Sequence, residues 1–321
     1  MLRLIRDANQ MSEQELTPMK PADLRASSAS ANLRKRQTTQ KLSFGLLWLA
    51  SLIVVLVLVV VVGYVFITGF KSLSWDFLTT APKGGLSGEG GISTTIITTI
   101  YLVALILVIA APLGIGAAIF MIEYQEQTKA GGKFVQALLQ AANFGVETLA
   151  GIPSIIFGLF GYALFVSTLK FGFSLLSAAL AGACLVLPTI IRTTQEALLT
   201  VPVSLREGSL ALGATRWQTI SKVVLPAAIP GIITGIMLSV GRIISETAVF
   251  YVTLGGSYRL PKSLLSGGRT LSLHLFYLAM DTNAFEKAMG TGAVLIVSII
   301  IINLVIDLIS RKLSAGVRQQ Q

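Results

Sequence analysis

The sequence predicts an all-α polytopic membrane protein with six transmembrane helices, and three observations lead to this prediction. Hydrophobic residues make up 53% of the 321 residues, and only 12% of the residues are charged. The mean hydropathy is +0.77, which together with the low charge places the chain among membrane proteins. Six long stretches contain no Asp, Glu, Lys or Arg: 42–70, 90–122, 148–169, 171–191, 223–241 and 288–306.

The lengths of these stretches predict the individual helices, because about 20 apolar residues are needed to cross the hydrocarbon core of a bilayer. We expect transmembrane helices at 44–68, 95–122, 146–166, 172–191, 229–254 and 291–309. One membrane domain then covers residues 42–312. Residues 1–41 are polar with little apolar periodicity and are expected to form a disordered tail, and residues 313–321 form a second tail.

The distribution of basic residues predicts the orientation. The net charge of +10 could indicate nucleic acid or anionic lipid, but most of the charge lies on one side of the six spans. That side holds residues 1–41, the residues after the last predicted span (310–321) and the loops 123–145 and 192–228, with 17 Lys and Arg against 7 on the other side. Cytoplasmic loops are enriched in Lys and Arg, so we expect a cell-membrane protein with both termini in the cytoplasm and no nucleic-acid partner. Loop 255–290 is the exception, since it carries Arg259, Lys262, Arg269 and Lys287 on the outer side.

The chain carries no motif of a nucleotide-binding protein or of an enzyme. It has no G-x-x-x-x-G-K-[ST] segment, and the GGK at 131–133 lacks the upstream glycine and the hydroxyl residue. The single cysteine, Cys184, and the single histidine, His274, offer neither a disulfide nor a metal cluster, and His274 is expected in a loop. We therefore expect no catalytic site, no metal and no cofactor bound by this chain.

Two charged residues interrupt the fifth predicted helix. Arg242 and Glu246 are four residues apart, so they share one helix face and are expected to pair. Counted from the predicted helix start, Arg242 lies about 20 Å along the axis, near the bilayer centre. Because an intramembrane charge is costly, the pair either neutralises itself as a structural element or lines a polar path. In such a path Arg242 attracts an anion, and Glu246 keeps the attraction weak enough for release.

Other residues mark helix ends and contacts. Arg192 lies at the cytoplasmic end of the fourth predicted helix, where an Arg is either a snorkelling anchor or part of the same path. Glu147 opens the third predicted helix and suits a helix N-terminus. Gly231 and Gly235 form a GxxxG motif that permits close helix approach. Three prolines are expected to bend or break helices: Pro112, Pro153 and Pro188.

The polar segment 204–226 stands between two long apolar runs and predicts a docking element. It is too amphipathic to cross a membrane and too regular in pattern to be a simple tether. We expect two short helices joined at Gly213, because glycine permits a turn with positive φ. Glu207 and Arg216 would then face a soluble partner, while the apolar residues of the loop pack against the membrane domain. Those residues are Ala211, Leu212 and Trp217.

This segment resembles the E-A-A-x3-G-x9-I-x-L-P loop of the MetI-like permeases of ABC importers. Glu207, Gly213 and the pair Leu225-Pro226 match in register. Gly208 and Ser209 replace the two alanines of the motif, and Val223 replaces the isoleucine. In that family the loop forms short coupling helices that enter a groove on the ATPase.

Five further blocks resemble the phosphate-specific importer permeases, and among these the PstA-like subunit. The blocks are PLGIGAAIFMIEY (112–124), LAGIPSIIFGLFG (149–161), LPTIIRTTQEAL (187–198), SLREGSLALGATRWQTI (204–220) and GRIISETA (241–248). The likeness covers about residues 90–310. In the family, intramembrane Arg and Glu residues are implicated in phosphate passage, and Arg192, Arg242 and Glu246 match those positions. Gln195 stands where one relative commonly has Glu, which puts an acidic role there in doubt.

The resemblance implies a permease subunit of an ATP-driven phosphate importer. Its implied partners are a second, PstC-like permease, an ATPase dimer that binds ATP and Mg²⁺, and an extracytoplasmic phosphate-binding protein. An importer of another oxyanion, such as phosphonate or sulfate, fits the arginines equally well. An ion-coupled secondary transporter is a rival from another class, but it predicts inverted repeats and broken-helix pairs, which the sequence does not display, and it leaves the docking loop unexplained.

Overall fold

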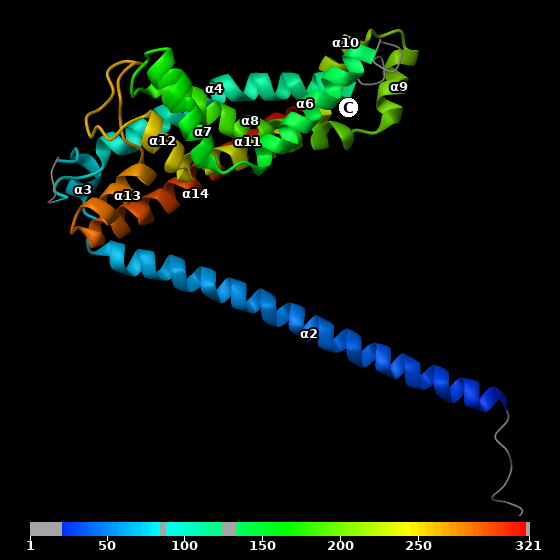
Figure 1. The fold of residues 1–321 in the computed structure, drawn as a ribbon. Coiled ribbons are helices and arrows are strands. Elements are labelled where there is room, and N and C mark those ends of the chain that lie inside the picture. Colours follow the sequence, from blue (N-terminus) through cyan, green and yellow to red (C-terminus); the bar gives the residue numbers. More distant parts are fainter. Residues whose placement is uncertain (1–20, 84–87, 124–132, 319–321) are drawn as a thin grey trace, which may run out of the picture. The chain divides into compact units, whose positions relative to one another are not determined.

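Figure 1 shows the computed structural model of the protein, which describes residues 21–83, 88–123 and 133–318. Within these ranges the regular structure is helical, apart from one isolated bridge between Pro82 and Gly90. This confirms the predicted all-α class. The contacts divide the chain into two units, residues 1–63 and residues 64–321.

The first unit consists, in its described part, of the long helix α2 (Pro21–Phe70), whose last residues enter the second unit. The part Thr39–Phe70 is long and apolar enough to cross a membrane, in agreement with the helix predicted at 44–68. Residues 21–41, predicted as disordered tail, belong to the same helix. The segment is rich in Ala, Leu, Arg and Lys and has no Gly or Pro after Pro21, so its helix propensity is high. The first 20 residues lie outside the described part.

Four helices of the second unit are long and apolar enough to cross a membrane. They are α4 (Ser93–Glu123), α8 (Leu175–Leu199), α11 (Leu225–Ser245) and α14 (Phe285–Arg318). α4 and α14 contain the predicted helices 95–122 and 291–309. α8 begins at Leu175 and continues to Leu199 rather than stopping at residue 191, so Arg192 lies inside this helix and not at its end.

The third predicted helix, 146–166, is wrong as a single element. The structure has α6 (Lys133–Gly151) and α7 (Ser154–Gly161), which continues as the π-helix η1 (Tyr162–Thr168), and the two arms are bent by 107°. Pro153 stands at the break because it lacks the backbone donor that a continuous helix would need. The predicted loop 123–145 is helical from Lys133 onward, and Glu147 lies in the later part of α6 rather than opening a helix. The bent pair counts as the sixth candidate span.

The fifth predicted helix, 229–254, is also divided. α11 ends at Ser245, and α12 (Ala248–Thr253) follows after an extended residue, Glu246, with φ −74° and ψ 128°. The Glu246 carboxylate accepts a hydrogen bond from the Val249 backbone N–H at 3.3 Å. An acidic side chain used in this way as a helix cap competes with continuation of the preceding helix. The expectation that the chain lacks broken helices was therefore wrong, since the described residues contain the bend at Pro153 and this break at Glu246.

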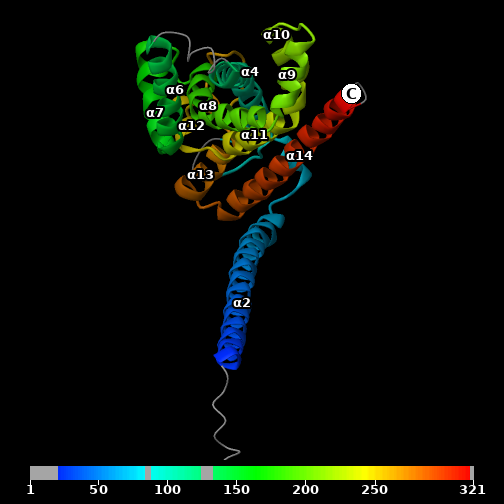
Figure 2. The ribbon, with the colours of Figure 1, turned by 90° about the vertical axis from the view of Figure 1, so that its right-hand side faces the viewer.

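α8 lies at the centre of the second unit, packed between α4 and α11 (Figure 2). Its contacts with α11 are made through small residues: a Cβ added to Gly231 would lie 2.5 Å from the Cβ of Ala197, and one added to Gly235 only 1.9 Å from Thr193 Oγ1. The close approach predicted from the GxxxG motif is thus confirmed. Pro188, inside α8, and Pro112, inside α4, do not end their helices.

The broken helices contact one another at a further glycine. A Cβ added to Gly158 of α7 would lie 3.0 Å from the Cα of Val249 in α12 and 2.8 Å from a methyl group of Val252. The second arms of the two broken helices therefore pack backbone against backbone.

α13 (Leu271–Asp281) lies within the predicted loop 255–290, so His274 is a buried helical residue and not a loop residue. Arg269 contacts it: its Nη1 lies 3.3 Å from His274 Nδ1, while its Nη2 donates to the Gly256 carbonyl oxygen at 2.6 Å. Burial, and then the neighbouring Arg269 charge, lower the pKa of His274 from 6.5 to about 3. The imidazole is therefore neutral at physiological pH and accepts the hydrogen bond from the guanidinium.

The same end of the second unit holds the short helix α3 (Trp75–Thr79), at the opposite end from α9 and α10 (Figure 1). Phe77 of α3 is buried beside Ile92 and Leu271. Lys287, in the first turns of α14, donates to the Gly88 carbonyl oxygen at 2.9 Å. Two of the four basic residues in 255–290, Arg269 and Lys287, thus serve internal contacts, which explains why this loop departs from the basic-residue distribution.

Candidate functional site: a two-helix loop and two membrane arginines

The predicted docking segment folds as two short helices. α9 (Val203–Ala211) is followed by a turn, by α10 (Arg216–Thr219), and by the π-helix η2 (Ile220–Val224), which leads directly into α11. In Figure 1 α9 and α10 lie together at one end of the second unit. The prediction of two helices joined at Gly213 is confirmed.

Gly213 ends α9 in a Schellman motif. Its φ is +85°, its N–H donates to the Leu210 carbonyl at 3.0 Å, and the N–H of Ala214 donates to the Ser209 carbonyl at 3.3 Å. These are the two bonds that define this helix ending, and a residue with a Cβ is disfavoured at the left-handed position. A Cβ at Gly213 would meet nothing within 4 Å. The requirement for glycine therefore comes from the backbone angle and not from crowding.

The second helix is fixed by its own cap. The Thr215 hydroxyl accepts from the Gln218 N–H at 3.3 Å, and the Gln218 side chain accepts from the Thr215 N–H at 2.8 Å, which completes a capping box. The hydroxyls of Ser209 and Thr219 lie 3.0 Å apart and join α9 to α10. Ser209, a departure from the alanine of the family motif, thus has a structural role.

The prediction that the apolar residues of the loop pack inward was wrong. Leu212 is 91% exposed and Trp217 is 63% exposed, and Ala211 is exposed as well. Glu207 and Arg216 are also exposed, as expected. The tip of the loop therefore presents a mixed apolar and charged surface.

Leu225 and Pro226 do not lie at the exposed tip of the loop with Glu207 and Gly213. Both are partly buried at the start of α11. Leu225 packs against a cluster that contains Ala197 and Leu198 of α8. Pro226 suits the first turn of a helix, where its missing N–H is not needed. These two residues fix the junction between the loop and α11, and they are not part of the exposed tip.

A hollow of about 470 Å³ lies between the loop and the ends of α4 and α8. Its lining residues are Ile122, Glu123, Leu199, Val203, Arg206, Glu207, Leu210, Arg216, Thr219 and Ile220. Beside it, Arg206 forms an ion pair with Glu123 at 2.9 Å. Sequence reasoning missed this pair because 83 positions separate the two residues, and only their charge at neighbouring helix ends could have suggested it.

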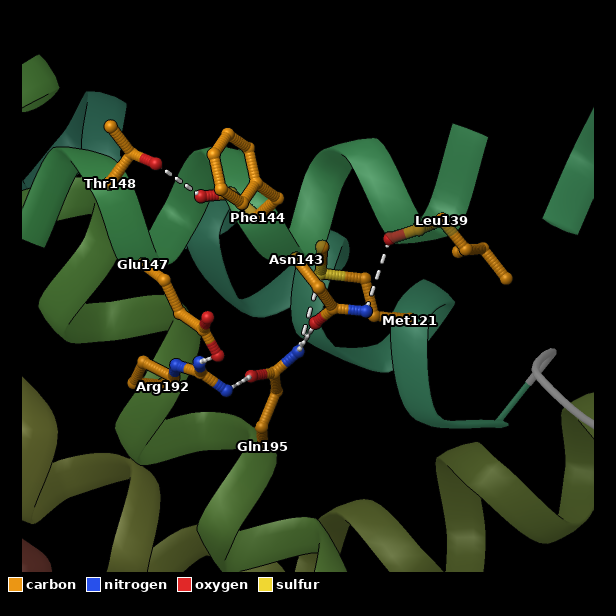
Figure 3. A network of polar contacts seen from close by, with 8 residues as sticks. All are labelled: Met121, Leu139, Asn143, Phe144, Glu147, Thr148, Arg192 and Gln195. Atoms are coloured by element: carbon orange, nitrogen blue, oxygen red, sulfur yellow. Dashed lines mark hydrogen bonds and ion pairs between the residues drawn. The ribbon is translucent and has the colours of Figure 1, made fainter. Parts of the chain in front are cut away.

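Arg192 belongs to a polar network that joins α8 to α6 (Figure 3). Its guanidinium forms an ion pair with Glu147, and it donates to the Gln195 side-chain oxygen at 3.4 Å. The Gln195 amide nitrogen in turn donates to Asn143 Oδ1 at 3.4 Å and lies 3.3 Å from Met121 Sδ. Gln195 is buried and uses both ends of its amide, and a carboxylate there could not donate these contacts.

The network borders a second hollow, of about 240 Å³. Its lining residues are Met121, Ile122, Asn143, Arg192, Gln195, Glu196 and Leu199. The Arg192 side chain is 39% exposed and the Glu147 side chain is 62% exposed. The ion pair is therefore partly open to solvent.

Arg242 lies in the last turn of α11, just before the break, rather than in mid-helix. Its expected pairing with Glu246 was wrong, because Glu246 has left the helix and caps α12 instead. The Arg242 side chain is exposed and makes no hydrogen bond or ion pair with any residue in the described ranges. A cation in the last turn is favoured by the helix dipole.

The two arginines stand at different depths of the same helix pair. Gly235 contacts Thr193, the neighbour of Arg192. Arg242 lies seven residues beyond Gly235, which corresponds to about 10 Å along the axis. The structure therefore does not bring Arg192 and Arg242 into one cluster.

Comparison with known proteins identifies the family. The protein family described as binding-protein-dependent transport system inner membrane component matches residues 130–319. A probable ABC transporter permease of Bacillus subtilis, YqgI, is 33% identical over 285 residues, with 84% of this chain and 94% of that protein covered. The PstA phosphate transport permease of Mycobacterium leprae is 34% identical over 295 residues, with 89% of this chain and 92% of that protein covered.

The fold agrees with this family. A subunit of the bacterial alginate ABC transporter, solved with its alginate-bound periplasmic protein, superposes with a TM-score of 0.60 at 16% identity, covering 84% of this chain and 95% of that chain. The chain therefore belongs to the binding-protein-dependent inner membrane components, which are transport subunits of ABC transporters. More particularly, it is an ABC importer permease subunit, and its relatives include proteins named as PstA phosphate transport permeases. The secondary transporter is excluded by membership of this family. A lack of broken helices does not exclude it, because the structure contains helix breaks.

The Schellman motif predicts opposite effects for two alanine substitutions in the loop. Gly213→Ala places a Cβ in the left-handed region, at a cost of about 1–2 kcal/mol. Gly208→Ala, in the interior of α9 with free space around it, should stabilise the helix by roughly 1 kcal/mol. We expect Gly213→Ala to weaken binding of the ATPase to the reconstituted permease, and Gly208→Ala to preserve it. Equal ATPase affinity for the two variants would contradict a docking role for this turn.

Proposed function

We propose that this chain is a permease subunit of an ATP-driven importer of inorganic phosphate. The observation that carries the proposal is the likeness, over most of the chain, to relatives named as PstA phosphate transport permeases. In the proposed complex a second permease completes the translocation path. A dimeric ATPase that binds ATP and Mg²⁺ supplies the energy, and an extracytoplasmic binding protein delivers phosphate.

The chemistry of the two arginines supports an oxyanion substrate. A guanidinium presents a planar fork of N–H donors that matches phosphate oxygens, and its charge is permanent. Arg242, exposed at the helix break and without a protein partner in the described ranges, is the proposed contact near the middle of the path. Arg192, about 10 Å away along the helices, is the proposed second contact, and its ion pair with Glu147 would open when phosphate arrives.

The role proposed for Glu246 follows from its position at the helix break, four residues after Arg242. Its carboxylate is held by the Val249 N–H, so it stands beside the path without neutralising the guanidinium. A fixed negative charge near a phosphate site repels the anion. Glu246 thus keeps the affinity of the site low enough for release, which a transport site requires.

The loop 204–226 is the proposed dock for the ATPase. The exposed residues Glu207, Leu212, Arg216 and Trp217 supply a mixed apolar and charged contact surface. Gly213 sets its shape, and Leu225 and Pro226 connect it rigidly to α11. When ATP closes the ATPase dimer, the docked loop moves together with the ATPase. This movement shifts α8 and α11, so that the arginines become accessible from the other side of the membrane. Hydrolysis reverses the movement.

We propose that both termini and this loop lie in the cytoplasm. The prediction is tested with Lys222→Cys and Lys262→Cys, two exposed positions on opposite sides, each in a Cys184→Ala background. A membrane-impermeant maleimide applied to intact cells should label the Lys262 variant and leave the Lys222 variant unlabelled until the membrane is opened. The reverse labelling pattern would invert the topology.

The substrate is tested by transport. The complex of both permeases and the ATPase, reconstituted in liposomes with its binding protein, should take up labelled phosphate in an ATP-dependent manner. Excess unlabelled phosphate should abolish the signal, while excess sulfate or phosphonate should leave it nearly unchanged. ATP-driven uptake of one of those competitors in place of phosphate would retain the permease and refute the phosphate assignment.

Arg242 gives a sharper test of the path. Arg242→Gln should leave the complex assembled but lower phosphate uptake about tenfold or more, since a charge-assisted hydrogen bond contributes roughly 1.5–3 kcal/mol. Arg242→Lys should retain part of the uptake, and Glu246→Gln should have a milder effect. Arg259→Gln, at an exposed position outside the spans, is the control and should transport normally. Normal uptake by Arg242→Gln would remove Arg242 from the path.

A further inference from the structure

Arg206 is placed differently from the other basic residues of the loop. It lies in the second turn of α9, and its side chain is only 19% exposed. Arg216 and Lys222, in contrast, are exposed and have no hydrogen-bond or ion-pair partner for their side chains within the described ranges. Arg206 therefore does not belong to the surface that a docked protein would contact. Its guanidinium points back toward the membrane domain.

Four contacts hold this guanidinium. Nη2 lies 2.9 Å from Glu123 Oε1 and donates to the Leu198 carbonyl oxygen at 2.8 Å. Nη1 donates to the Val201 carbonyl oxygen at 2.7 Å, and Nε to Glu123 Oε1 at 3.3 Å. One side chain thus joins three elements: α9, the last residue of α4, and the end of α8 with the turn that follows it.

We call this meeting point of α9, α4 and α8 at Arg206 the joint. Its electrostatics explain why a cation is needed there. Glu123 ends α4 and Leu198 lies in the last turn of α8, so two helix C-termini with their partial negative charge meet at this point. Glu123 adds a full negative charge where the helix dipole disfavours one. Its side chain is 11% exposed, so water compensates it only in part. Arg206 supplies the compensation, and α9 cannot shift against α4 and α8 without breaking charge-assisted bonds.

We propose that Arg206 is the positioning residue that transmits movement of the docked loop to α4 and α8. This inference rests on the proposed role of the loop as the ATPase dock. Displacement of α9 is passed through the guanidinium to the end of α8, about 10 Å from Arg192 on the same helix. The exposed tip of the loop holds the ATPase, and Arg206 converts its motion into a change at the substrate path.

The experiment compares variants in the complete complex and measures three quantities: the ATPase retained, the ATP hydrolysed, and the phosphate taken up. Arg206→Met keeps the length and apolar stem of the side chain but removes the charge and the fork of donors. We expect it to retain the ATPase and hydrolyse ATP, with the ratio of phosphate to ATP lowered about tenfold, within the 5–150-fold range of typical couplings between protein sites. Arg259→Met, at an exposed position outside the loop and outside the spans, is the control and should keep the normal ratio.

Two further variants cover the case in which Arg206→Met does not assemble. Arg206→Lys retains the charge without the fork geometry and should give an intermediate ratio. Glu123→Gln weakens the ion pair from the other side, at unchanged volume, and should also lower the ratio while the ATPase stays bound.

The outcomes separate this inference from the proposed function. A normal ratio in Arg206→Met, or in both Arg206→Lys and Glu123→Gln, would overturn the transmission role and leave the dock intact. Loss of the ATPase from the Arg206 and Glu123 variants, with hydrolysis and uptake falling in parallel, would show that the joint only holds the dock together. Failure of the unaltered complex to bind an ATPase would overturn both proposals.

Discussion

The close contact between α8 and α11 is the constraint on which the rest of the membrane domain depends. Two glycines of α11 lie directly on Thr193 and Ala197 of α8, with no room for a Cβ at either. Such contacts replace the hydrophobic driving force that is absent between helices in lipid, and they also fix the register of the pair. The register in turn sets the separation of Arg192 and Arg242. Both arginines therefore belong to one packed helix pair that leads into the two-helix loop.

The helix breaks solve a problem that the membrane creates. Backbone groups freed within a bilayer must find partners in the protein or in a cavity. At the α11–α12 break the Glu246 carbonyl accepts from the Ser272 hydroxyl at 2.6 Å, and the Glu246 carboxylate accepts from Val249 N–H. The Ser245 hydroxyl donates to the Gly241 carbonyl one turn earlier. The break is therefore satisfied internally, without a contribution from the adjoining Arg242 side chain.

Local rules explain which features could be predicted from the sequence. The Gly213 turn depends on one backbone angle and on residues within five positions, so it could be predicted from the local sequence. The α11–α12 break was not, because hydropathy stays high through 229–254 and only one carboxylate cap, at Glu246, interrupts the helix. The Arg206–Glu123 pair joins positions that only the fold brings together. The burial expected for Leu212 and Trp217 failed because apolar residues are not confined to the interior of a protein, and both lie at the exposed tip of the loop.

The turn at Gly213 has a consequence for how an assembly would form. Its two defining hydrogen bonds, the capping box at Thr215 and the Ser209–Thr219 contact are all made within the loop itself. The loop therefore holds its shape before any other protein arrives, and little conformational entropy is lost when it is engaged. A rigid, ready-made projection of this kind can be released and recaptured many times without refolding. Such a preformed surface is most useful to a protein whose contacts form and break repeatedly during a reaction cycle. It is equally useful to a complex that is assembled from separately made subunits.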